Sequence, residues 1–126
     1  MKLIKFRAKI AGTDVWIFGL PYAVYSDNYI DSIQSIETKQ VEYIKTDTLG
    51  QFTGGLDSNK TEIFHGDICK SDNLVFVVKW NNEAHAFLAH AGIEAVPFSW
   101  FSDVGANNCV KIGNMYDNPE LLQDAV

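Results

Sequence analysis

The sequence predicts a mainly β fold with minor α content: a small SH3-like or related barrel that carries an insertion and a short C-terminal helix. Its 126 residues are the length of one domain, so we expect a single domain over residues 1–126. Hydrophobic residues make up 47% of the chain and charged residues 21%, which allows a core without disulfides. Short segments that alternate apolar and polar residues follow one another closely, separated by turn-forming residues.

The first third of the chain predicts two strands and one ambiguous segment. Residues 4–9 alternate apolar and basic side chains, typical of a half-buried strand with a solvated basic face. Residues 15–18 predict a second strand, ended by Gly19 and Pro21. Within residues 22–40 isoleucines recur every third position, which suits a short helix. The β-branched, serine-rich composition of that segment suits a strand or an ordered loop equally well.

From residue 41 the pattern is β almost to the end of the chain, giving about nine strands in all. The further predicted strands cover residues 41–45, 51–53, 62–70, 74–80, 84–90, 96–101 and 109–112. Asn118 and Pro119 then predict the N-cap and first position of a helix of about two turns.

The five consecutive apolar residues 74–78 need cover on both faces of a sheet. We expect this cover from the insertion around residues 22–40 or from another subunit.

The charge balance disfavours nucleic acid as a partner. The chain has 10 basic and 16 acidic residues, a formal charge of −6, and Arg7 as its single arginine. Phosphate binding depends on basic residues, and arginine is the usual reader of guanine. We therefore expect no tight binding to DNA or RNA.

No secretory signal or membrane-spanning run is visible, since basic residues interrupt the apolar residues of the N-terminal segment. We expect a cytoplasmic protein, in a bacterial host, with no membrane association. Its two cysteines, Cys69 and Cys109, are then expected to be reduced.

Three blocks of sequence together resemble a known family. They are IKFRA at residues 4–8, TLGQFTG from residue 48 through GDI at 66–68, and IGNMYDNPELL at 112–122. In this order they resemble the YopX family, which phages and prophages carry. The resemblance implies a mainly β fold and a phage or prophage origin, and it implies no reaction. We expect backbone and turn roles for the motif residues Gln51, Thr53, Gly54, Asp57, Asn59, Gly66, Asp67, Gly113, Asn114, Tyr116, Asn118 and Pro119.

The sequence departs from the family pattern at three places. Lys9 stands where the family usually has Trp, and Gly55 where it often has Leu. Asn59-Lys60 replaces an Asn-Gly turn, so we expect Asn59 to supply any left-handed residue, which Asn tolerates better than most residues.

No arrangement of residues identifies a reaction, and we expect no catalytic residue, no cofactor and no metal. His85 and His90 are five residues apart, which places them on opposite faces of a strand. A metal site formed by Glu83, His85 and His65 is a minor alternative. Cys69 and Cys109 form no C-x-x-C pair, and a Cys–His nucleophile would require a coincidence of the fold.

The leading hypothesis is therefore a phage or prophage accessory protein, not an enzyme, that acts as a protein-binding or assembly module for a host or phage protein. The alternative is a nucleic-acid-associated β-barrel protein that uses the basic N-terminal strand with Trp16, Phe18 and Tyr22.

We also expect a homo-oligomer. As a strand, residues 96–101 would place Phe98 and Trp100 on one face and Phe101 on the other, so these three residues are the candidate interface. Pro97 predicts an edge position for this strand. The alternative is that residues 22–40 cover it within one chain. Separately, we expect the block 51–68 to organise the core through Phe52, Ile63 and Phe64.

Overall fold

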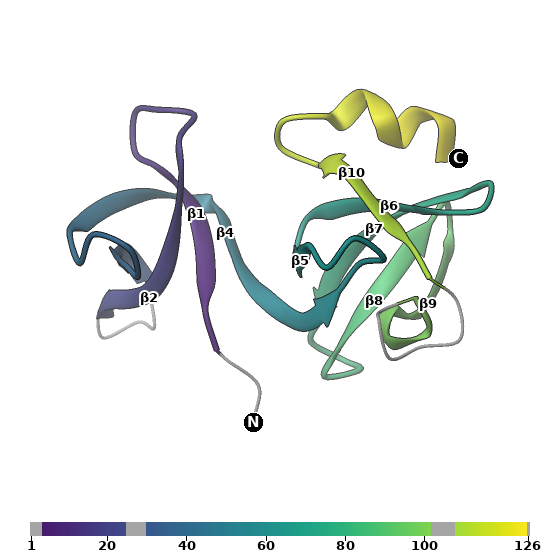
Figure 1. The fold of residues 1–126 in the computed structure, drawn as a ribbon, viewed down its shortest axis with the longest axis horizontal. Helices are drawn as coiled ribbons and strands as arrows, with labels where there is room; N and C mark the ends of the chain where they lie inside the picture. The colour runs from purple at the N-terminus through teal and green to yellow at the C-terminus, as the bar shows by residue number, and fades with distance from the viewer. Residues whose placement is uncertain (1–3, 25–29, 102–107, 126) are drawn as a thin grey trace. The chain divides into compact units, whose positions relative to one another are not determined.

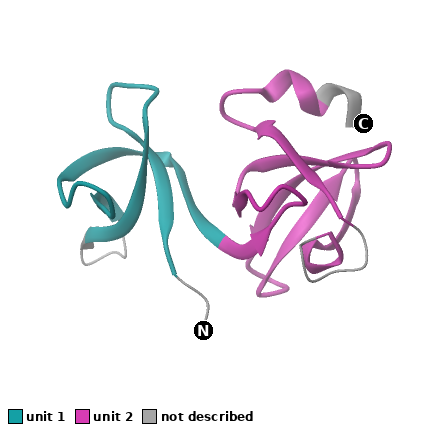
Figure 2. Cartoon of the chain, in the orientation of Figure 1, with its two compact units in different colours: residues 1–52 teal, residues 53–126 magenta. Residues whose placement is uncertain are grey.

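The computed structural model of this chain describes residues 4–24, 30–101 and 108–125 (Figure 1). The chain divides into two compact units, residues 1–52 and residues 53–126 (Figure 2). Within the described residues the fold is β-rich, as predicted, and no helix is long and apolar enough to cross a membrane. The expectation of one domain over residues 1–126 stays a prediction.

The elements follow one another along the chain with short connections. The strands are β1 (Phe6–Ile10), β2 (Trp16–Val24), β3 (Ile30–Ser35), β4 (Val41–Leu56), β5 (Glu62–Phe64), β6 (Asp67–Ser71), β7 (Leu74–Asn81), β8 (Ala86–Ala91), β9 (Glu94–Pro97) and β10 (Val110–Asn114). Two 3₁₀ helices, η1 (Phe98–Trp100) and η2 (Pro119–Ala125), complete the described elements.

The first unit is built on a partly closed ring of antiparallel strands. Strands β1, β2, β3 and β4 pair in that order, and β1 also pairs with β4. Four small and branched side chains, Ala8, Ile17, Ile33 and Ile44, form the buried centre of this ring. The arrangement is barrel-like, which is the architecture that the alternating strands predict.

Strand β2 is longer than predicted, because Gly19 and Pro21 do not end it. A Cβ on Gly19 would collide with the carbonyl oxygen of Gln34, so the absence of a side chain lets β3 pair closely. Pro21 is accommodated by a register shift in the β2–β3 pairing immediately after it.

The ambiguous segment resolves as a strand in its described part. Residues 30–35 form β3, which pairs with both β2 and β4 and is thus a member of the ring rather than a helix-bearing insertion. The predicted strands at 41–45 and 51–53 are two parts of the single strand β4.

The solvated basic face predicted for the N-terminal strand is wrong. Arg7 and Lys9 are buried, at 3% and 6% exposure. The Arg7 guanidinium carbon lies 4.5 Å from the centre of the Trp16 ring, and the Lys9 Nζ lies 5.6 Å from it. An aromatic face attracts cations, so Trp16 covers both side chains that sequence alternation alone assigns to solvent.

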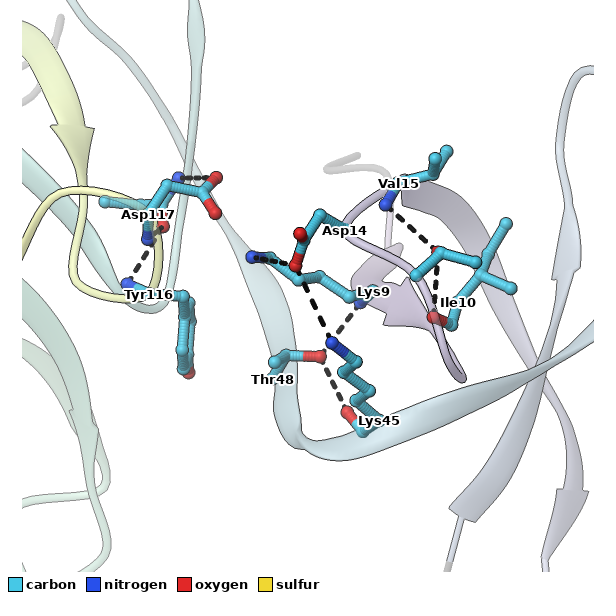
Figure 3. A network of polar contacts seen from close by, with 10 residues as sticks. Lys9, Ile10, Asp14, Val15, Lys45, Thr48, Tyr116 and Asp117 are labelled. Atoms are coloured by element: carbon cyan, nitrogen blue, oxygen red, sulfur yellow. Dashed lines mark hydrogen bonds and ion pairs between the residues drawn. The ribbon is translucent and has the colours of Figure 1, made fainter.

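Asp14 joins two lysines of this region in a small network (Figure 3). Its Oδ1 lies 3.4 Å from the Lys9 Nζ and 3.6 Å from the Lys45 Nζ. The Lys9 N–H donates to Thr48 Oγ1 at 2.8 Å, and that hydroxyl donates to the Lys45 carbonyl at 2.6 Å. The cations of the first unit are therefore largely engaged by the unit itself.

The second unit holds a five-stranded antiparallel sheet in the order β10-β6-β7-β8-β9. Its core contains Ile63, Cys69, Phe76, Val78, Ala89, Phe98, Phe101 and Cys109. The predicted strand at 62–70 is wrong as one element. A turn at His65-Gly66 divides it into β5 and β6, and Gly66 has a φ of 95° that only glycine adopts easily.

The predicted strand at 96–101 is also wrong. Strand β9 ends at Pro97, at the edge of the sheet as the proline indicates, and the chain then turns into η1. This turn directs Phe98 and Phe101 into the core, where the Phe101 ring centre lies 4.7 Å from that of Phe76. Trp100 is exposed. The argument for an aromatic edge strand therefore fails, because two of its three aromatic residues are core residues.

The cover that strand β7 requires comes from within the second unit. The C-terminal element η2 packs against β7, and Phe76, Val77 and Val78 are all buried. Leu74 at the start of the strand is exposed.

The expectation for the loop after β4 is wrong by one residue. Lys60, at the position where the family has glycine, adopts the left-handed conformation with a φ of 66°, and Asn59 does not. The left-handed residue therefore stands at the glycine position of the family pattern, and Lys60 is strained there.

Replacing Lys60 by glycine should raise the free energy of unfolding by about 1 kcal/mol. A residue with a Cβ costs about 1–2 kcal/mol in the left-handed conformation, and glycine avoids this cost. Part of the gain is lost because glycine also raises the conformational entropy of the unfolded chain. Urea unfolding measures the change. Asn59→Gly is the matched control and should lower the free energy of unfolding. Equal destabilisation by both changes would contradict the assignment.

The structure also assigns different weights to the three predicted anchors. Ile63 and Phe64 are fully buried, whereas Phe52 is half-buried under the Lys5 side chain. Phe64→Ala should therefore cost about 3–5 kcal/mol of stability, and Phe52→Ala distinctly less. Thermal unfolding of the two variants tests this order. A larger loss of stability in Phe52→Ala than in Phe64→Ala would contradict it.

Candidate functional site

The family motif residues of the second unit meet in one cluster around two buried carboxylates. Asp57 Oδ1 accepts the backbone N–H groups of Asn59 and Thr61 at 2.8 and 2.9 Å, and its Oδ2 accepts that of Lys111 at 2.9 Å. One side chain thus closes the loop after β4 and attaches it to β10.

Asp67 is the second carboxylate and has no exposed surface. Its Oδ2 accepts the Phe64 N–H at 2.7 Å and lies 3.2 Å from the Lys111 Nζ. The same ammonium donates to the Glu62 carbonyl at 2.9 Å. Sequence reasoning missed Lys111, although it is the only basic residue after Lys79 and is surrounded in sequence by acidic residues.

The third motif block folds into a turn that is seated on Gly66. The Met115 N–H donates to the Gly66 carbonyl at 2.8 Å, and a Cβ on Gly66 would lie 2.9 Å from the Tyr116 ring. A Cβ on Gly113 would lie 2.5 Å from Asn118 Oδ1. Both glycines are therefore required by close approach.

Two asparagines complete that turn. Asn114 Oδ1 accepts the N–H groups of Tyr116 and Asp117 at 3.0 and 2.8 Å, and Asn118 Oδ1 accepts the Asn114 N–H at 3.2 Å. Pro119 then begins η2.

The remaining motif residues lie on β4. Gln51 pairs with Phe6 of β1, the Thr53 hydroxyl donates to the Ile63 carbonyl at 2.7 Å, and Gly54 has a φ of 86°. The interactions described for the motif are thus turn, pairing and packing interactions.

The cysteines and histidines do not converge on a reactive site in the described parts of the chain. Cys69 and Cys109 are both buried in the core of the second unit, and a hydrogen bond between the thiols together with burial raises the pKa of Cys69. A buried thiol of raised pKa is a poor nucleophile. His65 Nδ1 accepts the Trp80 N–H at 2.9 Å, while Glu83 and His85 lie in the β7–β8 turn.

No group of three or more metal-ligating side chains occurs among the described residues. A shallow apolar hollow of about 60 Å³, lined by Leu74, Phe76, Ala89, Ala91, Glu94 and Val96, is far below the roughly 300 Å³ of a cofactor pocket.

The feature best suited to function lies on the first unit. The strands β2 and β4 and the turn after β3 present six large apolar side chains to solvent, and we call them the outer face: Phe18, Leu20, Tyr22, Ile36, Val41 and Tyr43. Tyr43 is 71% exposed, Tyr22 61% and Leu20 50%.

Sequence reasoning found only part of the outer face. It identified Phe18 and Tyr22, together with Trp16, as aromatic residues for nucleic acid. Leu20 was missed because the predicted strand 15–18 stops before it. Val41 and Tyr43 were placed in a predicted strand and Ile36 in the ambiguous segment, but local alternation did not show that these residues share one surface. The alternation of residues 16–22 was the available signal.

The candidate interface at Phe98, Trp100 and Phe101 is not a surface in this fold. Only Trp100 of the three is exposed, and the expectation of a homo-oligomer stays a prediction.

Comparison with known proteins supports the family resemblance. The family model described as YopX protein matches residues 5–123. No curated protein matches the chain. A crystal structure of protein EF1440 from Enterococcus faecalis is similar, with a TM-score of 0.68 and 22% sequence identity, covering 97% of this chain and 99% of that one. At this identity the likeness concerns the fold.

The Asp57 carboxylate makes stability depend on pH. Burial raises its pKa, but the hydrogen bonds from the Lys111, Thr61 and Asn59 N–H groups and the Lys111 charge together lower it below the ordinary value. The carboxylate therefore stabilises the fold fully above the ordinary Asp pKa of about 3.9, and this stability is lost as the pH falls through the lowered native value.

Asp57→Asn should cost about 1–3 kcal/mol at pH 7, because an amide presents a donor where the carboxylate accepts an N–H. Between pH 7 and pH 3, the free energy of unfolding should decrease less in the variant than in the wild type. Asp72→Asn, in an exposed turn, is the control. An equal decrease in the free energy of unfolding in the wild type and in Asp57→Asn would contradict the role of Asp57.

Proposed function

Because the chain belongs to the YopX protein family, we propose that it is a phage or prophage accessory protein that acts in the bacterial cytoplasm without catalysis, by binding protein through its outer face. The exposed apolar side chains of that face are the observation that carries the proposal. Contiguous apolar patches of this kind are uncommon on proteins that work alone, and they typify protein–protein contact sites.

The composition of the outer face fits a protein partner. Tyrosine and phenylalanine are enriched among the residues that contribute most to protein interfaces, and charged residues are depleted from the centres of such interfaces. Three of the six residues of the outer face are aromatic: Phe18, Tyr22 and Tyr43.

The alternative, a nucleic-acid-associated protein, has one observation in its favour. Trp16 and the aromatic residues of the outer face lie on a unit that also carries Lys5, Arg7, Lys9 and Lys45, a combination that can hold single strands. However, Arg7 and Lys9 are buried beside Trp16, and Asp14 lies beside Lys9 and Lys45. Few cations are therefore presented to a phosphate backbone.

We accordingly predict no submicromolar binding to single-stranded or duplex oligonucleotides at physiological salt, since the chain carries a charge of −6. Fluorescence anisotropy over a range of salt concentrations measures this. Tight, salt-sensitive binding would favour the alternative instead.

A photo-crosslinking residue tests the proposal directly. Introduced at Leu20 in cells that express the chain, it should give adducts with protein. The same residue at Asn73, which is exposed in the β6–β7 turn, should not. Absence of any protein adduct from position 20 would overturn the proposed function.

A further inference from the structure

We propose that the partner of the outer face is a second copy of this chain, which meets it face to face about a two-fold axis. This inference rests on the proposed function and specifies its partner. It also relocates the expected self-association from residues 98–101 to the first unit.

The outer face is continuous across three strands. Leu20, Gln34 and Val41 are consecutive partners in the β2–β3–β4 register, so they form one row on one side of the sheet. Beside this row, the Ile36 N–H donates to the Phe18 carbonyl at 3.0 Å, which places these two residues next to each other. Tyr43 is the register partner of Ser32 on the other side of the row.

The charge distribution permits two copies to meet at this surface. Residues 1–52 contain six basic and six acidic residues, whereas residues 53–126 contain four basic and ten acidic ones, so the second unit accounts for the whole charge of −6. An isologous contact opposes a surface to itself, so like charges on it would repel. The row of Leu20, Gln34 and Val41 carries no charged side chain, so this repulsion does not arise there.

The size of the outer face is in the range that a dimer needs. Large side chains have about 150–250 Å² each, so six of them at 40–71% exposure offer on the order of 600 Å² per chain. With Gln34, which lies between Leu20 and Val41 in the row, this approaches the roughly 800 Å² per partner of a standard interface. A partner that uses the same residues in return needs no second specialised surface.

The mass of the purified full chain in light scattering is the first test. We expect twice the single-chain mass of 14.1 kDa at micromolar concentration, and a single-chain mass for Leu20→Lys and Leu20→Glu. Ile93→Lys is the control, because Ile93 is fully exposed in the β8–β9 turn of the other unit, and this variant should keep the doubled mass. A single-chain mass for the wild type, or a doubled mass for both Leu20 variants, would overturn the inference.

Charge complementation shows whether the variants dissociate for the stated reason. In a two-fold contact through the central row, Leu20 of one copy lies opposite Leu20 or Val41 of the other. Mixing Leu20→Lys with Leu20→Glu, and separately with Val41→Glu, should restore the doubled mass in one of the mixtures. Near-ultraviolet circular dichroism of each variant confirms that it is folded. Restoration in neither mixture would overturn the two-fold arrangement.

The two proposals fail in different ways. A crosslink from position 20 to a different protein, with a single-chain mass for the wild type, would refute the second copy and leave the proposed function standing. A crosslink from position 20 to a second copy that Ile93→Lys retains and Val41→Lys abolishes, with a doubled mass for the wild type, supports both.

Discussion

The ion pair between Asp67 and Lys111 is the interaction on which the second unit depends. A carboxylate with no exposed surface is costly unless a charge and hydrogen bonds compensate it, so β10 has to lie where Lys111 can reach it. With β10 in place, the following turn is seated on Gly66, and η2 packs against β7. The motif residues around Asp57, Asp67 and Gly66 are thus parts of one assembly.

Sequence reasoning predicted the β-rich class, most strand centres, and the structural role of the motif. It could not find the Asp67–Lys111 pair, because 44 residues separate them and no local pattern joins distant charges. It also assigned Arg7 and Lys9 to solvent, because alternation ignores the possibility that a facing Trp16 covers a cation. Phe98 and Phe101 were misplaced because the turn into η1 changes the periodicity from that of a strand.

The two units differ in net charge and in the side chains that they expose. The second unit carries the charge and the interlocked motif, whereas the first presents uncharged apolar side chains on a small ring of strands. Trp16 contacts Arg7 and Lys9, and Asp14 pairs with Lys9 and Lys45. The six side chains of the outer face are the large apolar residues that these strands and the turn after β3 expose.

The central claim is that the motif is a structural assembly held by a buried ion pair. A double-mutant cycle of Lys111→Met and Asp67→Asn, followed by urea unfolding, tests it most directly. The account predicts that Lys111→Met alone costs about 3–5 kcal/mol, because it removes the cation from a buried carboxylate, and that adding Asp67→Asn costs little more or restores stability. An unchanged free energy of unfolding in Lys111→Met would contradict the account and require another role for these residues.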